Sequence, residues 1–231
     1  MANDEDPSPD QYPVHAPGWA AIDRAMARLH PGQTPHQFTS HTGYDLESKS
    51  PLPAVSVYEG RESRHWHYVT HGLSELFDKS SAHTSVSGFG FELTFALPCG
   101  EETTPPVWVL SLLQGIGGHV LSGHGALDSG HLIDLGGPLR LEPATKLSAL
   151  LCVPDPRLGK IDTPHGSLMF MSLLGVTSDE MAAMHAWSLE RKVGLVADVA
   201  PLAITEPDRL AFEADPRTSP AYRRAALGLK L

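Results

Sequence analysis

The chain has 231 residues, of which 41% are hydrophobic and 19% are charged, and this composition fits a globular protein and excludes the disordered and fibrous classes. Its formal net charge of −10 argues against nucleic acid as a partner, because nucleic-acid binding depends on clustered Lys and Arg. The longest apolar run, residues 168–176, is too short to cross a membrane. The 13 histidines are numerous for this length and raise the question of a metal site.

The beginning of the sequence lacks the cationic and apolar features of a secretory leader, and residues 1–15 are acidic and rich in proline. We expect a disordered lead-in there. Cys99 and Cys152 lack the spacing of a redox or metal motif, which predicts reduced thiols in a cytoplasmic protein. Without repeats or a linker composition, residues 16–216 are predicted to form one domain, and residues 217–231 a tail or short helix.

The first predicted elements are a helix followed by short strands. Apolar residues recur at three- and four-residue steps over residues 17–30 and predict a helix with one buried face. Extended segments follow at residues 37–41, 54–58 and 64–70, where β-branched and aromatic side chains are enriched.

The clearest strand covers residues 89–97, because apolar and polar or small residues alternate strictly along it. The side chains predicted to share its buried face are Phe89, Phe91, Leu93, Phe95 and Leu97. Their burial contributes roughly 8–15 kcal/mol, whereas ordering the segment costs about 1–2 kcal/mol per residue. The strand therefore has to lie centrally against other elements.

The second half of the chain is predicted to add helices and further strands. Thr104 opens a helix whose glycines suggest close approach by another backbone, and residues 122–138 are glycine-rich and irregular. A capping box at residues 177–180 opens another helix, which we expect Gly194 to divide from a further helical piece. The remaining predicted strands cover residues 147–153, 167–174, 202–205 and 210–212.

These elements predict the fold class α+β: a single domain with a mixed or antiparallel central sheet flanked by helices. Motifs for cofactor binding and catalysis are missing. Gly88-Phe89-Gly90 lacks the third glycine of a dinucleotide fingerprint, and Ile161 stands where a phosphate-binding loop needs Ser or Thr. No GxSxG nucleophile motif occurs. We therefore predict neither a cofactor nor an enzymatic activity.

Two groups of histidines leave metal binding open as an alternative. His65 and His67 lie on one face of a predicted strand, with His71 nearby, so they suit a metal-dependent hydrolase or lyase. The more ordinary alternative is that one imidazole is packed and hydrogen-bonded while the other faces solvent. The glycine-rich loop offers further ligand types without a recognised spacing. Its candidate ligands are His119, His124, Asp128, His131 and Asp134.

Glu92 faces away from the aromatic row of its strand. Its carboxylate suits a general base, or an acceptor for the backbone or a basic group of a protein partner. The alternative is a carboxylate that faces water or a basic residue of the neighbouring strand.

Several long segments, in order, closely resemble the signature segments of Suppressor of fused domain proteins. The resemblance extends over roughly residues 16–216. The segments that carry it are HWHYVTHGLSELF (65–77), SGFGFELTFALP (87–98), PPVWVLSLLQGIGGHVLSG (105–123), DPRLGKIDTPHGSLMFMSLLGVTSDE (155–180) and ITEPDRLAFEADP (204–216).

This resemblance implies a non-catalytic protein-binding module with the fold of the family's N-terminal domain. Animal members sequester Gli-type transcription factors and restrain Hedgehog signalling, and they clamp the Gli peptide as an added strand between two domains. The present chain ends near the end of the first domain, so it is more similar to the bacterial branch. Such domains have been proposed as immunity proteins that neutralise toxins, which would make a toxin domain or an extended peptide the expected partner.

The resemblance also assigns the partner-binding segment to residues 119–131, with His119, Leu127 and His131 at the aligned positions. Family members usually carry an acid after the Ser-Gly pair, whereas this chain has His131, which implies a different partner. Because histidine gains charge near neutral pH, we expect this segment to become more positive on mild acidification.

Overall fold

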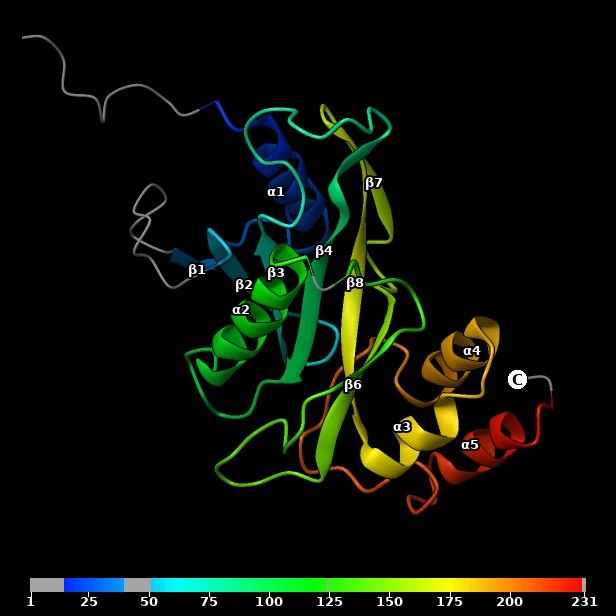
Figure 1. Ribbon diagram of the computed structural model, residues 1–231. Helices are drawn as coiled ribbons and strands as arrows, with labels where there is room; N and C mark the ends of the chain where they lie inside the picture. The colour runs from blue at the N-terminus through cyan, green and yellow to red at the C-terminus, as the bar shows by residue number, and fades with distance from the viewer. Residues whose placement is uncertain (1–14, 40–50, 124, 230–231) are drawn as a thin grey trace, which may run out of the picture.

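The computed structural model describes residues 15–39, 51–123 and 125–229, which form one sheet with helices on both faces (Figure 1). The helices are α1 (Pro17–Leu29), α2 (Trp108–Leu121), α3 (Ser178–Met184), α4 (Leu189–Val199) and α5 (Ser219–Ala226). The strands are β1 (His36–Thr39), β2 (Ala54–Gly60), β3 (His65–His71), β4 (Val86–Pro98), β5 (Leu132–Asp134), β6 (Leu147–Pro154), β7 (Lys160–Thr163) and β8 (Gly166–Thr177). None of the helices in the described ranges has the length and apolar character needed to cross a bilayer.

The sheet follows the strand order β1-β2-β3-β4-β8-β6-β5, and β7 pairs with β8 beside this path. The pair β4 and β8 is parallel, and the other pairs are antiparallel. The predicted α+β class with a mixed central sheet and flanking helices is therefore confirmed. In this order β5 lies at one end of the sheet and β1 lies at the other.

α2 covers one face of the sheet, and α1 together with α3, α4 and α5 covers the other (Figure 1). β3 is buried along its whole length, so its side chains alternate between two apolar layers. Tyr68 packs in the α2 layer, whereas Val69 packs in the α1 layer. The odd-numbered His65, His67 and His71 point to the same side as Val69 and are also buried.

β4 lies centrally in the sheet, as the alternation predicts, but the predicted burial of one of its residues, Phe89, is wrong. Residues 91, 93, 95 and 97 are buried, whereas Phe89 is 40% exposed. The register with β8 shifts between Val86 and Phe91. Gly88 and Gly90 both have a positive φ within this stretch. The backbone irregularity interrupts the alternation, so the buried face does not extend back to Phe89.

Gly117 and Gly118 of α2 make room for side chains and not for the expected backbone, whereas Gly115 faces open space. A Cβ atom at Gly117 would lie 2.6 Å from Cγ of Leu52. Leu52 is completely buried and enters the core at this position. α2 also begins at Trp108, later than the predicted Thr104.

Several predicted boundaries near the C-terminus differ from the structure. The predicted capping box is present at Thr177, but the following helix ends at Met184, and Gly194 lies inside α4 and does not divide two helices. The strands predicted at 202–205 and 210–212 are absent from those residues, where the one β-bridge joins Ile204 to Ala96. β5 and β7 form in segments that looked irregular. β5 depends on its pairing with β6, whereas β7 forms a tight hairpin with β8 in which Thr163 pairs with Gly166.

Candidate protein-binding site

The α2–β5 segment, residues 119–134, leads from the last turn of α2 to the edge of the sheet; residue 124 lies outside the described residues. A β-bulge joins it to β6: the Gly130 N–H donates to the Cys152 carbonyl at 2.7 Å, and the Cys152 N–H donates to the His131 carbonyl at 2.9 Å. Gly130 has φ +86°, as the first residue of such a bulge requires. The bulge fixes where β5 begins.

A tight turn precedes the bulge and orients His131. The His131 N–H donates to the Asp128 carbonyl at 3.1 Å, and the positive φ of Gly130 at the third position is typical of a type II turn. The Asp128 N–H donates in turn to Nδ1 of His131 at 3.0 Å. The His131 ring therefore closes the turn as an acceptor at Nδ1.

β5 leaves backbone groups at the outer edge of the sheet. The His131 carbonyl and the Leu135 N–H bond to β6, so the odd residues of this stretch face β6. In an antiparallel pair the intervening residues point the other way. The backbone N–H and C=O groups of Leu132 and Asp134 therefore face the free edge, where an extended peptide can add as a strand.

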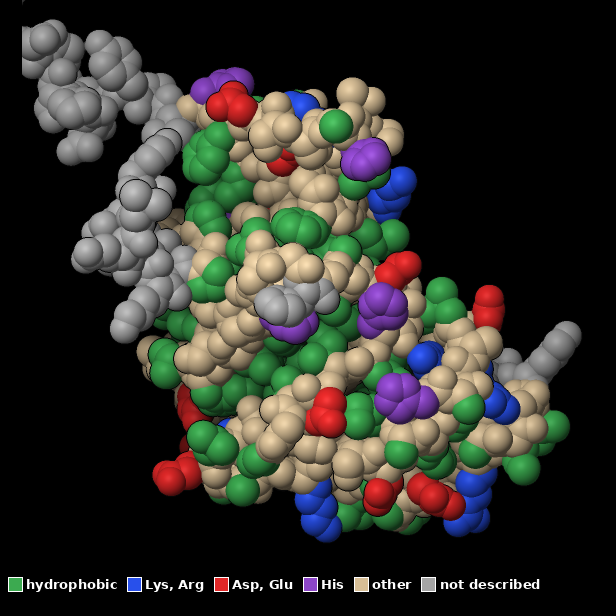
Figure 2. Space-filling model, in the orientation of Figure 1, with side chains coloured by type: hydrophobic (Ala, Val, Ile, Leu, Met, Phe, Trp, Pro, Cys, Tyr) green, Lys and Arg blue, Asp and Glu red, His purple; other side chains and the backbone are tan. Residues whose placement is uncertain are grey.

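The predicted binding residues lie along this segment with different exposure. His119 is exposed in the last turn of α2, and His131 is exposed where β5 begins. Leu127 is half-buried against the α2 layer. Figure 2 shows histidine side chains at the surface near the C-terminal end of α2. His124 lies outside the described residues.

The backbone edge of β5 was missed by sequence reasoning, which treated residues 122–138 as irregular. The short apolar stretch from Leu132 to Leu135 was the available signal. Three strand residues between glycines are too few to reveal a period of two, so only the pairing with β6 identifies the strand.

Glu92 was predicted as a partner-binding residue, and this assignment is wrong because the side chain is completely buried. Its carboxylate accepts hydrogen bonds from the Thr70 hydroxyl at 2.6 Å, the Gly72 N–H at 2.9 Å, and the N–H and hydroxyl of Ser74 at 2.9 and 2.7 Å. Burial raises the pKa of Glu92, although these donors act in the opposite direction. The carboxylate ties β4 to the turn after β3.

His65 and His67 are both engaged by protein groups. Nε2 of His67 lies 3.2 Å from Oδ2 of Asp155, and its Nδ1 lies 3.0 Å from Nε2 of His30. Nε2 of His65 lies 2.6 Å from the guanidinium of Arg157, and Nδ1 contacts the Ser63 carbonyl. Within the described ranges no group of three or more His, Cys, Asp or Glu is arranged to hold a metal ion.

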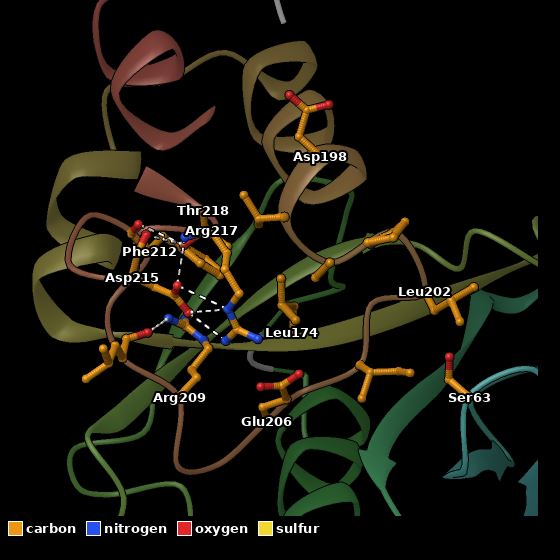
Figure 3. A pocket seen from close by; sticks show the side chains of 15 residues that line it. Ser63, Leu174, Asp198, Leu202, Glu206, Arg209, Phe212, Asp215, Arg217 and Thr218 are labelled. Carbon is orange, nitrogen blue, oxygen red and sulfur yellow. Dashed lines mark hydrogen bonds and ion pairs between the residues drawn. The ribbon is translucent and has the colours of Figure 1, made fainter. Parts of the chain in front are cut away.

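A cavity of about 340 Å³ lies between the end of α4 and the segment before α5 (Figure 3). Both arginines of its lining form ion pairs: Arg217 donates to the Asp215 carboxylate at 2.7 Å, and Arg209 donates to the buried Glu180 carboxylate at 2.6 Å. Leu174 and Phe212 add apolar lining. These are the contacts of structural ion pairs, and they favour no catalytic chemistry.

Comparison with known proteins identifies relatives that share this arrangement. Residues 48–210 match the family model described as Suppressor of fused protein. The chain is 32% identical over 218 residues to the human and mouse Suppressor of fused homologues. The match covers 86% of this chain and 45% of each relative, so the chain spans about half their length.

Solved structures give the same result. A chain of the Sufu–Fu complex has a TM-score of 0.79 and 30% identity, covering 88% of this chain and 96% of the other. Drosophila Suppressor of Fused has a TM-score of 0.78 and 31% identity, with coverages of 88% and 53%. A homologue from Neisseria gonorrhoeae shares the fold at a TM-score of 0.56 and 15% identity, with coverages of 84% and 96%.

Proposed function

Because this chain belongs to the Suppressor of fused family, we propose that it is a non-catalytic module that binds an extended segment of a protein partner along the free edge of β5. The observation that carries the proposal is the edge at Leu132 and Asp134, which no strand of the described residues pairs and which the bulge at Gly130 holds in place. A relative solved as a Sufu–Fu complex supports a protein as the class of ligand. His119, Leu127 and His131 would then contact side chains of the added strand.

More specifically, we propose that the chain is an immunity protein that neutralises a toxin domain in the cytoplasm. Its support is the net charge of −10, which would attract a basic partner and speed its association. If electrostatic attraction contributes to binding, the affinity for the partner should weaken when the salt concentration rises from about 50 to 500 mM. An affinity that does not change with salt would contradict the electrostatic part.

Photo-crosslinking in the native host tests the binding edge. A photoreactive residue at Asp134 is expected to cross-link one stoichiometric partner, whereas the same residue at the exposed Gln37 of β1, on the opposite edge, is not. Asp134→Pro removes the outward N–H and should weaken binding of the recovered partner about tenfold or more. Equal cross-linking from both edges, or an unchanged Kd for Asp134→Pro, would reject this site.

If the recovered partner is a toxin, co-expression decides the finer proposal. Cells that produce the toxin should grow when the unaltered chain is present and fail to grow with Asp134→Pro. If the recovered partner is not toxic, the immunity role is rejected, but the proposed binding site on β5 is retained.

A further inference from the structure

We propose that the cavity between the last turn of α1 and the turn after β6 binds a small oxyanion, such as phosphate or a phosphate monoester, through Arg28 and Arg157. The cavity measures about 180 Å³. Its lining residues are Ala25, Arg28 and Leu29 from α1, and Arg157 and Leu158 from the turn. The lining thus includes two arginines and no acidic residue.

Arg157 has donors that the described protein does not satisfy. Its Nη1 lies 2.6 Å from Nε2 of His65. The Nδ1 of His65 contacts the Ser63 carbonyl and so carries the proton, which leaves Nε2 as a neutral acceptor. Nε and Nη2 of Arg157 are buried and have no hydrogen-bond partner among the described residues. These two nitrogens form the edge of a guanidinium that chelates an oxyanion with two parallel hydrogen bonds.

The nearest carboxylate cannot serve Arg157, because its oxygens are occupied. Oδ2 of Asp155 contacts His67 and accepts from the Thr94 hydroxyl. Oδ1 accepts from the backbone N–H groups of Arg157 and Leu158 at 2.9 and 3.0 Å. Asp155 therefore shapes the turn that presents Arg157 and leaves the guanidinium edge free. Of the ion pairs formed between described residues, none includes Arg157 or Arg28.

Arginines add positive charge around the cavity, beside the Asp155 and Glu62 carboxylates that also interact with Arg157. Arg28 is exposed beside the cavity, and exposed Arg61 donates to the Pro31 carbonyl just after α1. Cations offset the partial negative charge at the C-terminal end of a helix, which accounts for Arg28 and Arg61. That effect does not account for the two unpartnered, buried nitrogens of Arg157.

The size of the cavity selects the ligand class. Pockets for organic ligands usually measure about 300–1,000 Å³, so this one suits a single tetrahedral oxyanion and is too small for a nucleotide. Because the unpartnered nitrogens have almost no accessible surface, the Arg157 side chain has to turn toward the cavity before they can bind an anion there.

Titration calorimetry of the full chain with inorganic phosphate at about pH 7.5, against sodium chloride of equal ionic strength, tests the site. We expect one phosphate per chain. Arg28→Gln should weaken binding about tenfold or more, and Arg157→Gln should abolish it. Arg24→Gln, an exposed arginine one turn earlier on α1, is the matched control and should bind within about twofold of the unaltered chain.

Arg157 also contacts His65, so the binding result for Arg157→Gln is used only if the circular dichroism spectrum of this variant matches that of the unaltered chain. If the spectra differ, the binding result for Arg28→Gln decides the test. O-phosphoserine is the second probe. Binding equal to phosphate indicates that a monoester fits, and binding weaker by about tenfold or more indicates free phosphate as the ligand. No binding of phosphate, or equal affinity in the unaltered chain and Arg28→Gln, would overturn the proposal.

Discussion

Replacement of Arg209 by methionine is expected to lower the free energy of unfolding by about 3–5 kcal/mol. The guanidinium donates to both carboxylate oxygens of Glu180, at 2.8 and 2.6 Å, and to the Gly175 carbonyl at 2.9 Å. Only 8% of the Arg209 side chain and 3% of the Glu180 side chain are exposed. Loss of the arginine leaves a buried carboxylate without its counter-ion, which is the costly half of a buried ion pair.

Glu180 also organises its surroundings, which adds to the expected effect. Its carboxylate accepts from the backbone N–H of Thr177 in the capping box and from that of Phe212. The Arg209 guanidinium also lies 3.7 Å from the centre of the Phe212 ring. The ion pair therefore connects the start of α3 to the segment that leads to α5.

Urea denaturation followed by tryptophan fluorescence measures this change. Arg224→Met is the matched control, because Arg224 pairs with Asp198 at 3.3 Å while 52% and 36% of the two side chains are exposed. An exposed pair contributes about 0–1 kcal/mol. Equal losses for Arg209→Met and Arg224→Met would show that burial of the first pair does not matter for stability.

The protein is expected to unfold on acidification, between about pH 4 and 5, because it buries neutral histidines. Burial lowers the pKa of His71 to about 3 and that of His65 to about 4. Burial, assisted by His67 and Arg157, lowers the pKa of His30 to about 3. Burial acts to raise the pKa of the neighbouring Asp155, but hydrogen bonding to His67 and other contacts lower it overall.

The sign of the pH effect follows from proton binding. A histidine in the unfolded chain titrates near about 6.5, so below this pH the unfolded state binds more protons than the folded state. The stabilisation is complete above about pH 6.5 and is lost as the pH falls toward the folded values. At pH 5 each of the three histidines then lowers the free energy of unfolding by up to about 2 kcal/mol. The sum of about 6 kcal/mol is comparable with the whole free energy of unfolding of a typical domain.

His71→Phe tests this origin of acid sensitivity. Phenylalanine keeps an aromatic ring against Trp19, whose ring centre lies 4.4 Å from that of His71, but it cannot bind a proton. The slope of unfolding free energy against pH should decrease by about 1.4 kcal/mol per pH unit between about pH 5 and 6.5. His83→Phe, at an exposed position, should keep the slope of the unaltered chain. A slope that His71→Phe does not reduce would contradict buried neutral histidine as the cause.

Elements with a strong local pattern could be predicted from the sequence. The apolar period of α1, the alternation along β4 and the capping box of α3 are each complete within a few turns or strand residues. β5 could not be predicted in this way, since its existence depends on pairing with residues 149–151 of β6. The end of the alternation at Phe89 likewise depends on the register between β4 and β8.

The sequence by itself determined the family and the fold class of this protein, because long segments in order resemble Suppressor of fused proteins and the mixture of helices and strands is local information. Only the tertiary structure decided the roles of its polar residues. Glu92 and the histidines of β3 lie on a strand face that either solvent or a helix could cover. Burial by α1 converts the histidines into neutral core groups. The outer edge of β5 and the Arg157 donors that have no partner among the described residues are the places that we propose for a partner and a ligand.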